Sequence, residues 1–295
     1  MQSEYSDYQG DPTNPPAGPP GQPEPGDEGG LPRRQMVPVS MPAVRPLATY
    51  TLLGIIIAVY LAGLVLPFSP RVIDGFLVSS TEDWLFIQGA KINDFIIGRG
   101  EVYRLLTAMF LHGGLTHLFF NAYALYLIGR NLERVFGHAR YLLIYFLGGL
   151  TGSLFSLLFS PYASVGASGA IFAIFGAEIV FIYRNRRVFG RAAYRQLQSM
   201  AMVLALNVLI GLTPGSRIDN WGHMGGFVAG LALAWFMGPR LRVVVAQDAV
   251  VLSGGDVPAL EMVDDNTPRQ WLAVPILYAA LYVLVLGAFL QMQGM

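Results

Sequence analysis

Seven apolar stretches alternate with polar segments along the chain after residue 44. A helix needs about 20 predominantly apolar residues to cross the hydrocarbon core of a bilayer. The stretch 115–128 is too short and needs a further turn at one end, and 200–212 is also short. The pattern predicts seven membrane-spanning helices, at Ala48–Phe68, Leu115–Ile128, Tyr141–Phe159, Ala167–Tyr183, Met200–Leu212, Trp221–Met237 and Trp271–Leu290.

The polar segments divide the chain into four parts. Residues 1–44 are rich in Pro, Gly and acidic side chains, which bury too little apolar surface to fold, so we expect a disordered cytoplasmic tail. This tail also lacks the basic start and apolar core of a signal peptide. Residues 45–242 hold six of the predicted helices, and 271–295 hold the seventh. We expect 243–270, which end in Asp-Asp-Asn-Thr-Pro, to be a flexible cytoplasmic linker.

A long loop, residues 69–114, separates the first two predicted helices. It scatters Trp84, Phe86, Phe95 and Ile96 among polar residues. This amphipathic character favours a folded or interfacial loop over a linker.

The composition agrees with a membrane protein. Hydrophobic residues make up 54% of the 295 positions and charged residues only 13%, against about 25% charged in soluble domains. The fold class we predict is therefore an all-α polytopic membrane protein. The chain has no cysteine, which excludes disulfides, thiolate catalysis and cysteine-ligated metals. A net charge of zero gives no reason to expect a nucleic-acid partner, and we predict none.

The distribution of Lys and Arg predicts the orientation. Cytoplasmic loops carry an excess of these residues. With the N-terminus in the cytoplasm and the helices alternating in direction, 14 of the 19 basic residues fall on the cytoplasmic side. We therefore expect the N-terminus inside and the C-terminus outside. The basic residues left outside are Arg71, Lys91, Arg99, Arg104 and Arg217.

Four polar residues share one depth in this arrangement. Ser168 and His223 each lie in the first turn of a predicted helix, and His117 and Asn121 lie one turn apart on one face of another. All four are within about two turns, roughly 10 Å, of the outer boundary. Polar side chains inside a bilayer are costly, so they indicate either function or hydrogen bonding between helices. A serine with two histidines at one depth favours function.

Small residues predict how the helices that carry Ser168 and His223 pack. Gly222, Gly226 and Gly230 are four residues apart and form a smooth face on the helix at 221–237. Gly169, Ala173 and Ala177 form the matching face on the helix at 167–183. Such faces allow close contact between backbones. If they pack together, Ser168 and His223 emerge side by side, as a histidine base and a serine nucleophile require.

Four short motifs can be written from these residues and their neighbours: Gly166-Ala-Ser168-Gly, His223-x-x-Gly226-x-x-x-Gly230, His117-x-x-x-Asn121 and Gly129-x-x-x-Glu133-x-x-x-Gly137. Each motif is short, but their order, depth and spacing together are specific. They resemble the motifs of the rhomboid family of intramembrane serine proteases. The resemblance covers about residues 46–240, and the seventh helix resembles that of family variants with one extra C-terminal helix.

The resemblance implies a rhomboid-like six-helix core and an intramembrane endopeptidase with a Ser–His dyad. Ser168 would be the nucleophile and His223 the general base, while His117, Asn121 and the Ser168 backbone N–H would form the oxyanion hole. Phe172 lies where the family packs an aromatic ring on the catalytic histidine. The mechanism needs no metal or other cofactor.

The partners that the resemblance implies are transmembrane protein substrates, cut near their outer end within the lipid bilayer. An intact helix hides its carbonyls, so substrates should expose an unwound backbone of small residues there. The family and the absence of an organelle signal suggest the plasma (inner) membrane of a bacterium.

Several residues depart from the family pattern or lie outside its motifs. Many rhomboids have Trp-Arg in the long loop, where this chain has Tyr103-Arg104, and we expect the loop to dock similarly. Glu178 is about 15 Å deeper than Ser168 along the helix, too far to complete a triad, and we expect it to pair with Arg184 or Arg134. Two further residues are interpreted as loop residues, Asp219 near the outer surface and His138 in solvent.

Two other functions remain open at this point. The first is a catalytically silent rhomboid-like protein that binds transmembrane clients, which loss of Ser168 or His223 would indicate. The second is a transporter or channel, which would need polar groups through the full membrane thickness and often has inverted repeats. The polar groups cluster in the outer half and we find no repeat, so the protease is favoured.

Overall fold

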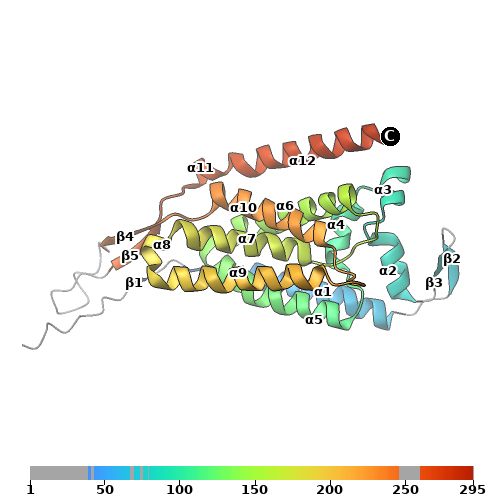
Figure 1. Cartoon of the computed structure of the whole chain (residues 1–295), viewed down its shortest axis with the longest axis horizontal. Coiled ribbons are helices and arrows are strands. Elements are labelled where there is room, and N and C mark those ends of the chain that lie inside the picture. Colours follow the sequence, from blue (N-terminus) through green and yellow to red (C-terminus); the bar gives the residue numbers. More distant parts are fainter. Residues whose placement is uncertain are drawn as a thin grey trace, which may run out of the picture. The chain divides into compact units, whose positions relative to one another are not determined.

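The computed structural model describes residues 39–40, 43–66, 70–73, 76–78, 80–245 and 260–294. Nearly all of the predicted tail lies outside these residues. Helices dominate the described chain (Figure 1). The main helices are α1 (Leu47–Val65), α5 (Leu115–Ala124), α6 (Arg130–Phe159), α7 (Ser168–Arg184), α9 (Arg191–Gly211), α10 (Asn220–Met237) and α12 (Ala273–Met292). Short elements are β1 (Val39–Ser40), β2 (Arg71–Ile73), β3 (Phe76–Val78), α2 (Thr81–Gly89), α3 (Asn93–Arg99), α4 (Arg104–Thr107), α8 (Arg186–Phe189), β4 (Leu241–Val245), β5 (Leu260–Asp264) and α11 (Pro268–Trp271).

Among the described residues, three helical stretches are long and apolar enough to cross a membrane, Leu47–Val65, Leu115–Phe159 and Pro268–Met292. The second stretch bends sharply at Gly137, where φ is 76° and ψ is 163°, so it supplies two antiparallel segments. Its first segment includes a π-helical turn at Leu125–Gly129, which extends the helix well beyond the predicted 115–128. The predicted spans at α7, α9 and α10 do not meet this criterion of length and apolar composition, because α7 has 17 residues and α9 and α10 carry polar side chains. The protein is an all-α polytopic membrane protein.

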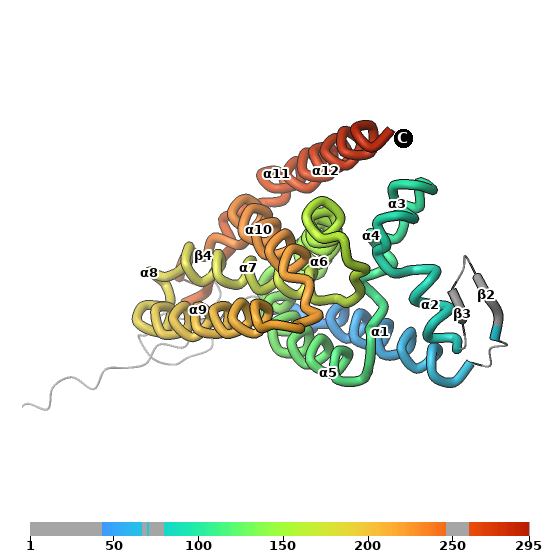
Figure 2. Tube along the Cα trace, turned by 45° about the vertical axis from the view of Figure 1, so that its right-hand side comes forward, coloured from blue at the N-terminus to red at the C-terminus, as the bar shows by residue number. Residues whose placement is uncertain are grey.

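Helices α6, α7 and α10 lie side by side (Figure 2). They meet through residues without bulky side chains. A Cβ added to Gly226 would overlap the carbonyl oxygen of Gly169, and one added to Gly230 would overlap that of Ala173. Gly152 of α6 lies against Gly222 in the same way. The predicted contact between the two small-residue faces is therefore confirmed, and α6 adds a third face.

Glu133 joins α1 to the first segment of α6. Its carboxylate is fully buried and accepts hydrogen bonds from the backbone N–H groups of Ala48 (2.8 Å) and Thr49 (2.7 Å). These first-turn N–H groups have no acceptor within α1. His138, which we expected in solvent, instead lies 2.5 Å from Glu133 through Nδ1, although its side chain is 46% exposed. Glu133, the middle residue of the Gly129–Gly137 motif, thus stabilises the start of α1.

The long loop after α1 is folded into α2, α3, α4 and a 3-10 turn at Ala108–Phe110. These elements lie at the end of the bundle where α5 begins (Figures 1 and 2). Arg104 holds the loop together, since its guanidinium is 2% exposed and donates to Glu101 (2.6 Å) and to the carbonyl of Ile87 (2.7 Å). It also lies over the ring of Tyr103, 5.5 Å from its centroid. The Tyr103-Arg104 pair thus orders the loop.

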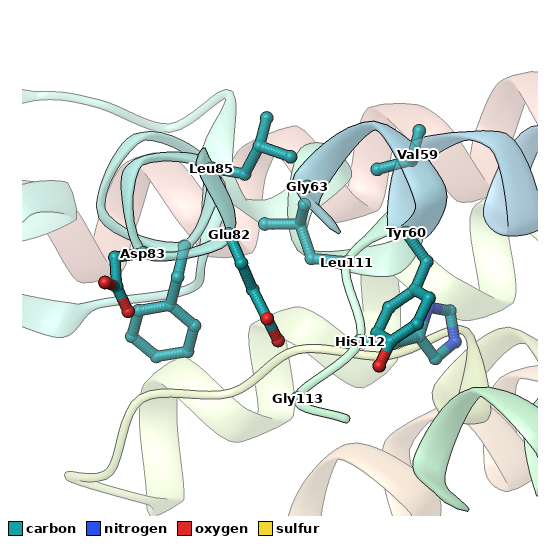
Figure 3. A pocket seen from close by; sticks show the side chains of 10 residues that line it. Val59, Tyr60, Gly63, Glu82, Asp83, Leu85, Leu111, His112 and Gly113 are labelled. Carbon is teal, nitrogen blue, oxygen red and sulfur yellow. The ribbon is translucent and has the colours of Figure 1, made fainter. Parts of the chain in front are cut away.

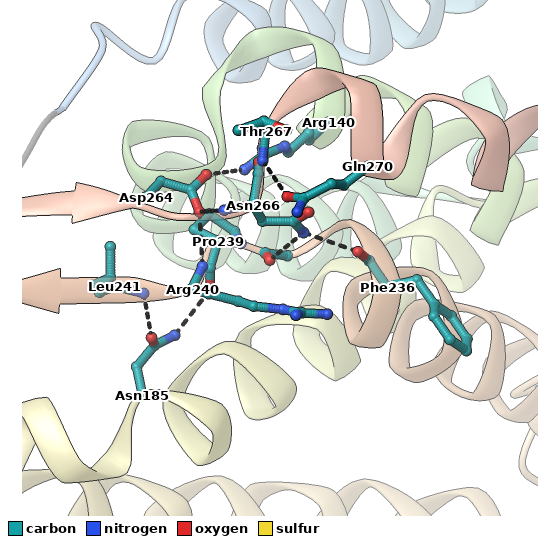
Figure 4. Close-up of polar contacts among 11 residues, drawn as sticks. Arg140, Asn185, Phe236, Pro239, Arg240, Leu241, Asp264, Asn266, Thr267 and Gln270 are labelled. Atoms are coloured by element: carbon teal, nitrogen blue, oxygen red, sulfur yellow. Dashed lines mark hydrogen bonds and ion pairs between the residues drawn. The ribbon is translucent and has the colours of Figure 1, made fainter.

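The predicted flexible linker is structured at both of its ends, which corrects that expectation. Strand β4 pairs antiparallel with β5, and β1 pairs parallel with β5. After β5, Asn266 donates to the carbonyls of Phe236 and Gly238 at the end of α10, both at 2.9 Å (Figure 4). Residues 246–259 lie outside the described residues.

Arg140 of α6 fastens the segment that leads to α12. Its guanidinium donates to the Asp264 carboxylate at 2.6 Å and to the backbone carbonyl of Asn266 (Figure 4). It also lies 4.9 Å from the ring centroid of the buried Trp271. Further along, α12 rests on α6, where the hydroxyls of Tyr278 and Thr151 are 2.9 Å apart. The seventh helix is therefore attached to α6 at its start and along its length.

Candidate active site

The side chains of Ser168 and His223 meet directly. The distance from Ser168 Oγ to His223 Nε2 is 2.8 Å. Ser168 is the first residue of α7, and His223 lies in the first turn of α10. A hydrogen bond of this length allows the imidazole to accept the hydroxyl proton.

The starts of α7 and α10 set this geometry. Gly166, at φ +128°, has a conformation that side chains rarely adopt, and it turns the chain into α7. Asp219 is the N-cap of α10, because its carboxylate accepts from the backbone N–H of Gly222 at 2.9 Å. Asp219 was expected to be a plain loop residue, and this capping role corrects that interpretation. The close contact of Gly226 with Gly169 then brings the two helix starts together.

Phe172 covers one face of the His223 ring. The two ring centroids are 4.3 Å apart and the planes are inclined by 18°, which is a stacked arrangement. Phe172 is one turn after Ser168 on α7, so the same helix supplies the hydroxyl and the surface that orients the imidazole. Stacking limits rotation of the His223 ring and keeps Nε2 directed at Ser168.

His117, on α5, lies beside Gly166, two residues before Ser168, and Asn121 is one turn further along α5. Gly166 lies so close to His117 that an added Cβ would be 2.8 Å from Nε2 of the ring. The backbone N–H of Gly113 donates to His117 Nδ1 at 3.4 Å, which leaves the proton of the neutral ring on Nε2, facing Gly166. Asn121 donates from Nδ2 to the carbonyl of His117 at 2.9 Å. Its amide group keeps a second N–H available.

A small cavity of about 20 Å³ borders Ser168 and His223 and is also lined by Gly166 and Asp219. The Ser168 backbone N–H faces no acceptor in its own helix, as holds for the first N–H groups of any α-helix. The His117 ring and the Ser168 hydroxyl both lie near Gly166, since an added Cβ there would be 2.8 Å from His117 Nε2 and 3.7 Å from Ser168 Oγ. Among the described residues, no group of three or more His, Asp or Glu could hold a metal ion.

His112, to which the sequence analysis gave no role, lies next to His117. The ring centroids are 5.1 Å apart with one edge facing the other, and His112 is 6% exposed. Burial, with a smaller contribution from His117, lowers the pKa of His112 to about 4. It also lines a larger cavity of about 130 Å³ that Tyr60 and Glu82 border (Figure 3). In the sequence, this contact was indicated by the position of His112, five residues before His117.

Glu178 does not reach this site. Its carboxylate accepts from Gln196 Nε2 of α9 at 3.3 Å, so the expected partners Arg184 and Arg134 were wrong. Arg184 instead donates to the backbone carbonyl of Trp235. Glu178 thus links α7 to α9.

Comparison with known proteins gives one family. Residues 99–240 match the Rhomboid domain. The chain is 42% identical over 160 residues to the rhomboid protease GluP of Bacillus subtilis, and the matched region covers 54% of this chain and 31% of GluP. It is 36% identical over 148 residues to RHOMBOID-like protein 1 of Arabidopsis thaliana, covering 50% of this chain and 37% of that protein. With YdcA of Bacillus subtilis it shares 34% identity over 141 residues, 47% of this chain and 69% of YdcA. The match thus spans only about a third of GluP and of RHOMBOID-like protein 1.

Proposed function

Because the chain belongs to the rhomboid family, we propose that it is an intramembrane serine endopeptidase with a dyad of Ser168 and His223. The observation that carries the proposal is the 2.8 Å contact between Ser168 Oγ and His223 Nε2 at the starts of two tightly packed helices. The family alone supports an intramembrane protease or a rhomboid-like protein. The dyad of Ser168 and His223 is the more specific part of the proposal.

In this mechanism Ser168 Oγ attacks the carbonyl carbon of the scissile bond while His223 Nε2 takes its proton. The tetrahedral oxyanion accepts hydrogen bonds from the Ser168 N–H, His117 Nε2–H and the second N–H of Asn121. Each such donor contributes about 10²–10³ in rate, because it acts on charge that develops in the transition state. His223 then gives its proton to the leaving amine, and the C–N bond breaks.

Water completes the cycle. His223 takes a proton from a water molecule, the hydroxide adds to the acyl ester, and the proton returns to Ser168 Oγ as the acid product leaves. We propose that the substrates are transmembrane segments of other proteins, which exposed apolar residues on α5 and α9 could meet within a lipid bilayer. We further propose a bacterial plasma membrane, with the N-terminus in the cytoplasm and the C-terminus outside.

The test is cleavage of a purified transmembrane test substrate in proteoliposomes. Ser168→Ala and His223→Ala should each abolish turnover without lowering the melting temperature. Ser199→Ala, in an exposed serine of α9, is the matched control and should keep full turnover. Undiminished turnover in either dyad variant would refute the assignment. Binding of the substrate by the wild type without any cleavage would instead identify the silent rhomboid-like alternative.

A further inference from the structure

Lys91 is a buried cation that this mechanism does not use. It lies between α2 and α3 in the long loop, and the residue is 1% exposed. Its ammonium group donates to three backbone carbonyls, of Ser156 (3.2 Å), Ser160 (3.2 Å) and Tyr162 (2.7 Å). It also donates to Asn93 Oδ1 at 2.9 Å. A lysine is almost never fully buried unless it is paired, and here four oxygen acceptors surround the ammonium group.

The three carbonyls belong to the end of α6 and to the segment that follows it. The last four carbonyls of an α-helix have no partner within the helix and carry partial negative charge. The Lys91 ammonium supplies donors and positive charge at this end of α6. Asn93 supports it, because its Nδ2 also donates to the carbonyl of Ser160 at 3.0 Å.

The backbone of Lys91 binds the same segment further along. Its N–H donates to the Ser164 carbonyl and its carbonyl accepts from the Ser164 N–H, each at 3.0 Å. Two residues later, Gly166 N–H donates to the carbonyl of Ala108, again in the long loop, at 2.9 Å. Residues 160–167 are thus attached to the long loop at both ends, directly before Ser168.

We propose that Lys91 is a positioning residue for the active site, which fixes residues 160–167 so that Ser168 and its backbone N–H stay aligned with His223 and His117. This inference rests on the proposed function. Lys91 acts through the segment and touches no reacting atom. The physical reason is that an error of about 1 Å in the position of a reacting group can cost about 10²-fold in rate.

The test compares Lys91→Met, which keeps an unbranched apolar side chain one atom shorter and removes the ammonium group, with Thr81→Val as control. Thr81 is also buried in the long loop and donates to a backbone carbonyl, that of Leu66 at 2.7 Å, away from residues 160–167. We expect Lys91→Met to lower kcat about 10- to 100-fold with KM within twofold, and to speed amide exchange at Ser164 and Gly166. Thr81→Val should change neither, even where the two variants lose the same amount of melting temperature.

Asn93→Ala keeps the proposal testable if Lys91→Met does not fold. It removes one of the donors to Ser160 and should produce a smaller change in kcat and in the same amide exchange. The proposal is overturned if kcat of the folded variants stays within twofold of wild type, or if exchange at residues 160–167 is unchanged. Amide exchange is measured independently of turnover. An inactive wild-type protein would refute the proposed function, whereas unchanged exchange at residues 160–167 in Lys91→Met would still overturn the role of Lys91 and faster exchange would still support it.

Discussion

At the scale of single residues, the main question is whether Asp219 makes the site a triad. Its carboxylate accepts from Gly222 N–H in the first turn of α10 and so acts as a helix cap. Asn caps helices about as well as Asp, so Asp219→Asn removes the charge and keeps the cap. We expect a change in turnover of a few-fold at most between pH 6 and 9. A triad carboxylate would be worth about 10⁴-fold, so a loss of several hundredfold would establish a triad.

His112 provides a prediction about pH. Its pKa is about 4 in the folded protein and 6.5 ordinarily, so between these values the unfolded chain binds the extra proton and the folded one does not. The contribution of His112 to stability is therefore lost as pH falls from 6.5 towards 4, by about 1 to 3 kcal/mol. In detergent, the melting temperature of wild type should fall more steeply over this window than that of His112→Gln. Parallel curves would contradict the burial of a neutral His112.

Much of the site could be predicted at this scale, because a polar side chain inside an apolar helix is costly and is kept only where it bonds or reacts. Ser168, His223, His117 and Asn121 stand out by type and depth, whereas Phe172 was expected only from the family resemblance. Other contacts could not be predicted, because they depend on segments far apart in sequence. In the sequence, Lys91 is an ordinary lysine of the outer loop, and only the fold brings it next to Ser156 and Tyr162. Glu178 pairs with Gln196, which lies in the polar first half of α9, a part that was not assigned to a predicted span.

At the scale of helices, the contact between α7 and α10 determines whether the dyad forms. We expect Gly226→Val to lower the melting temperature and abolish turnover, because its side chain would overlap the Gly169 carbonyl and push the two helices apart. Gly54→Val in α1 is the control, since an added Cβ there has no heavy atom of the described residues within 4 Å. If Gly226→Val melts and turns over like wild type, this packing is not what aligns Ser168 with His223.

The helix boundaries show which features the pattern of apolar residues can predict and which it cannot. The ends of α7 and α10 were predicted within a residue or two, because apolar runs there begin and end abruptly. The second span was predicted too short, since polar residues up to Gly137 look like a loop until Glu133 is seen capping α1. Strands β4 and β5 were missed because each is only five residues long and pairs across residues 246–259, in a segment interpreted as a flexible linker.

At the scale of the whole molecule, a cluster around Arg140 connects the start of the seventh helix to the core. We expect Arg140→Ala to lower the melting temperature and to speed amide exchange over 264–272, because it removes the ion pair with Asp264 and the contact with Trp271. Turnover should stay within a few-fold, since the dyad lies on α7 and α10. Arg269→Ala, an exposed arginine in α11, is the control. Unchanged exchange in Arg140→Ala would show that α12 is held by its own packing on α6.

The central claim is that Ser168 is an activated nucleophile, and fluorophosphonate labelling tests it most directly. The reagent forms a covalent bond with an activated serine, and the intact mass of the purified protein counts the adducts. We expect one adduct on the wild type, mapped to Ser168, none on Ser168→Ala, and labelling of His223→Ala slowed at least a hundredfold because the base is missing. Equal labelling of the wild type and Ser168→Ala would contradict the account.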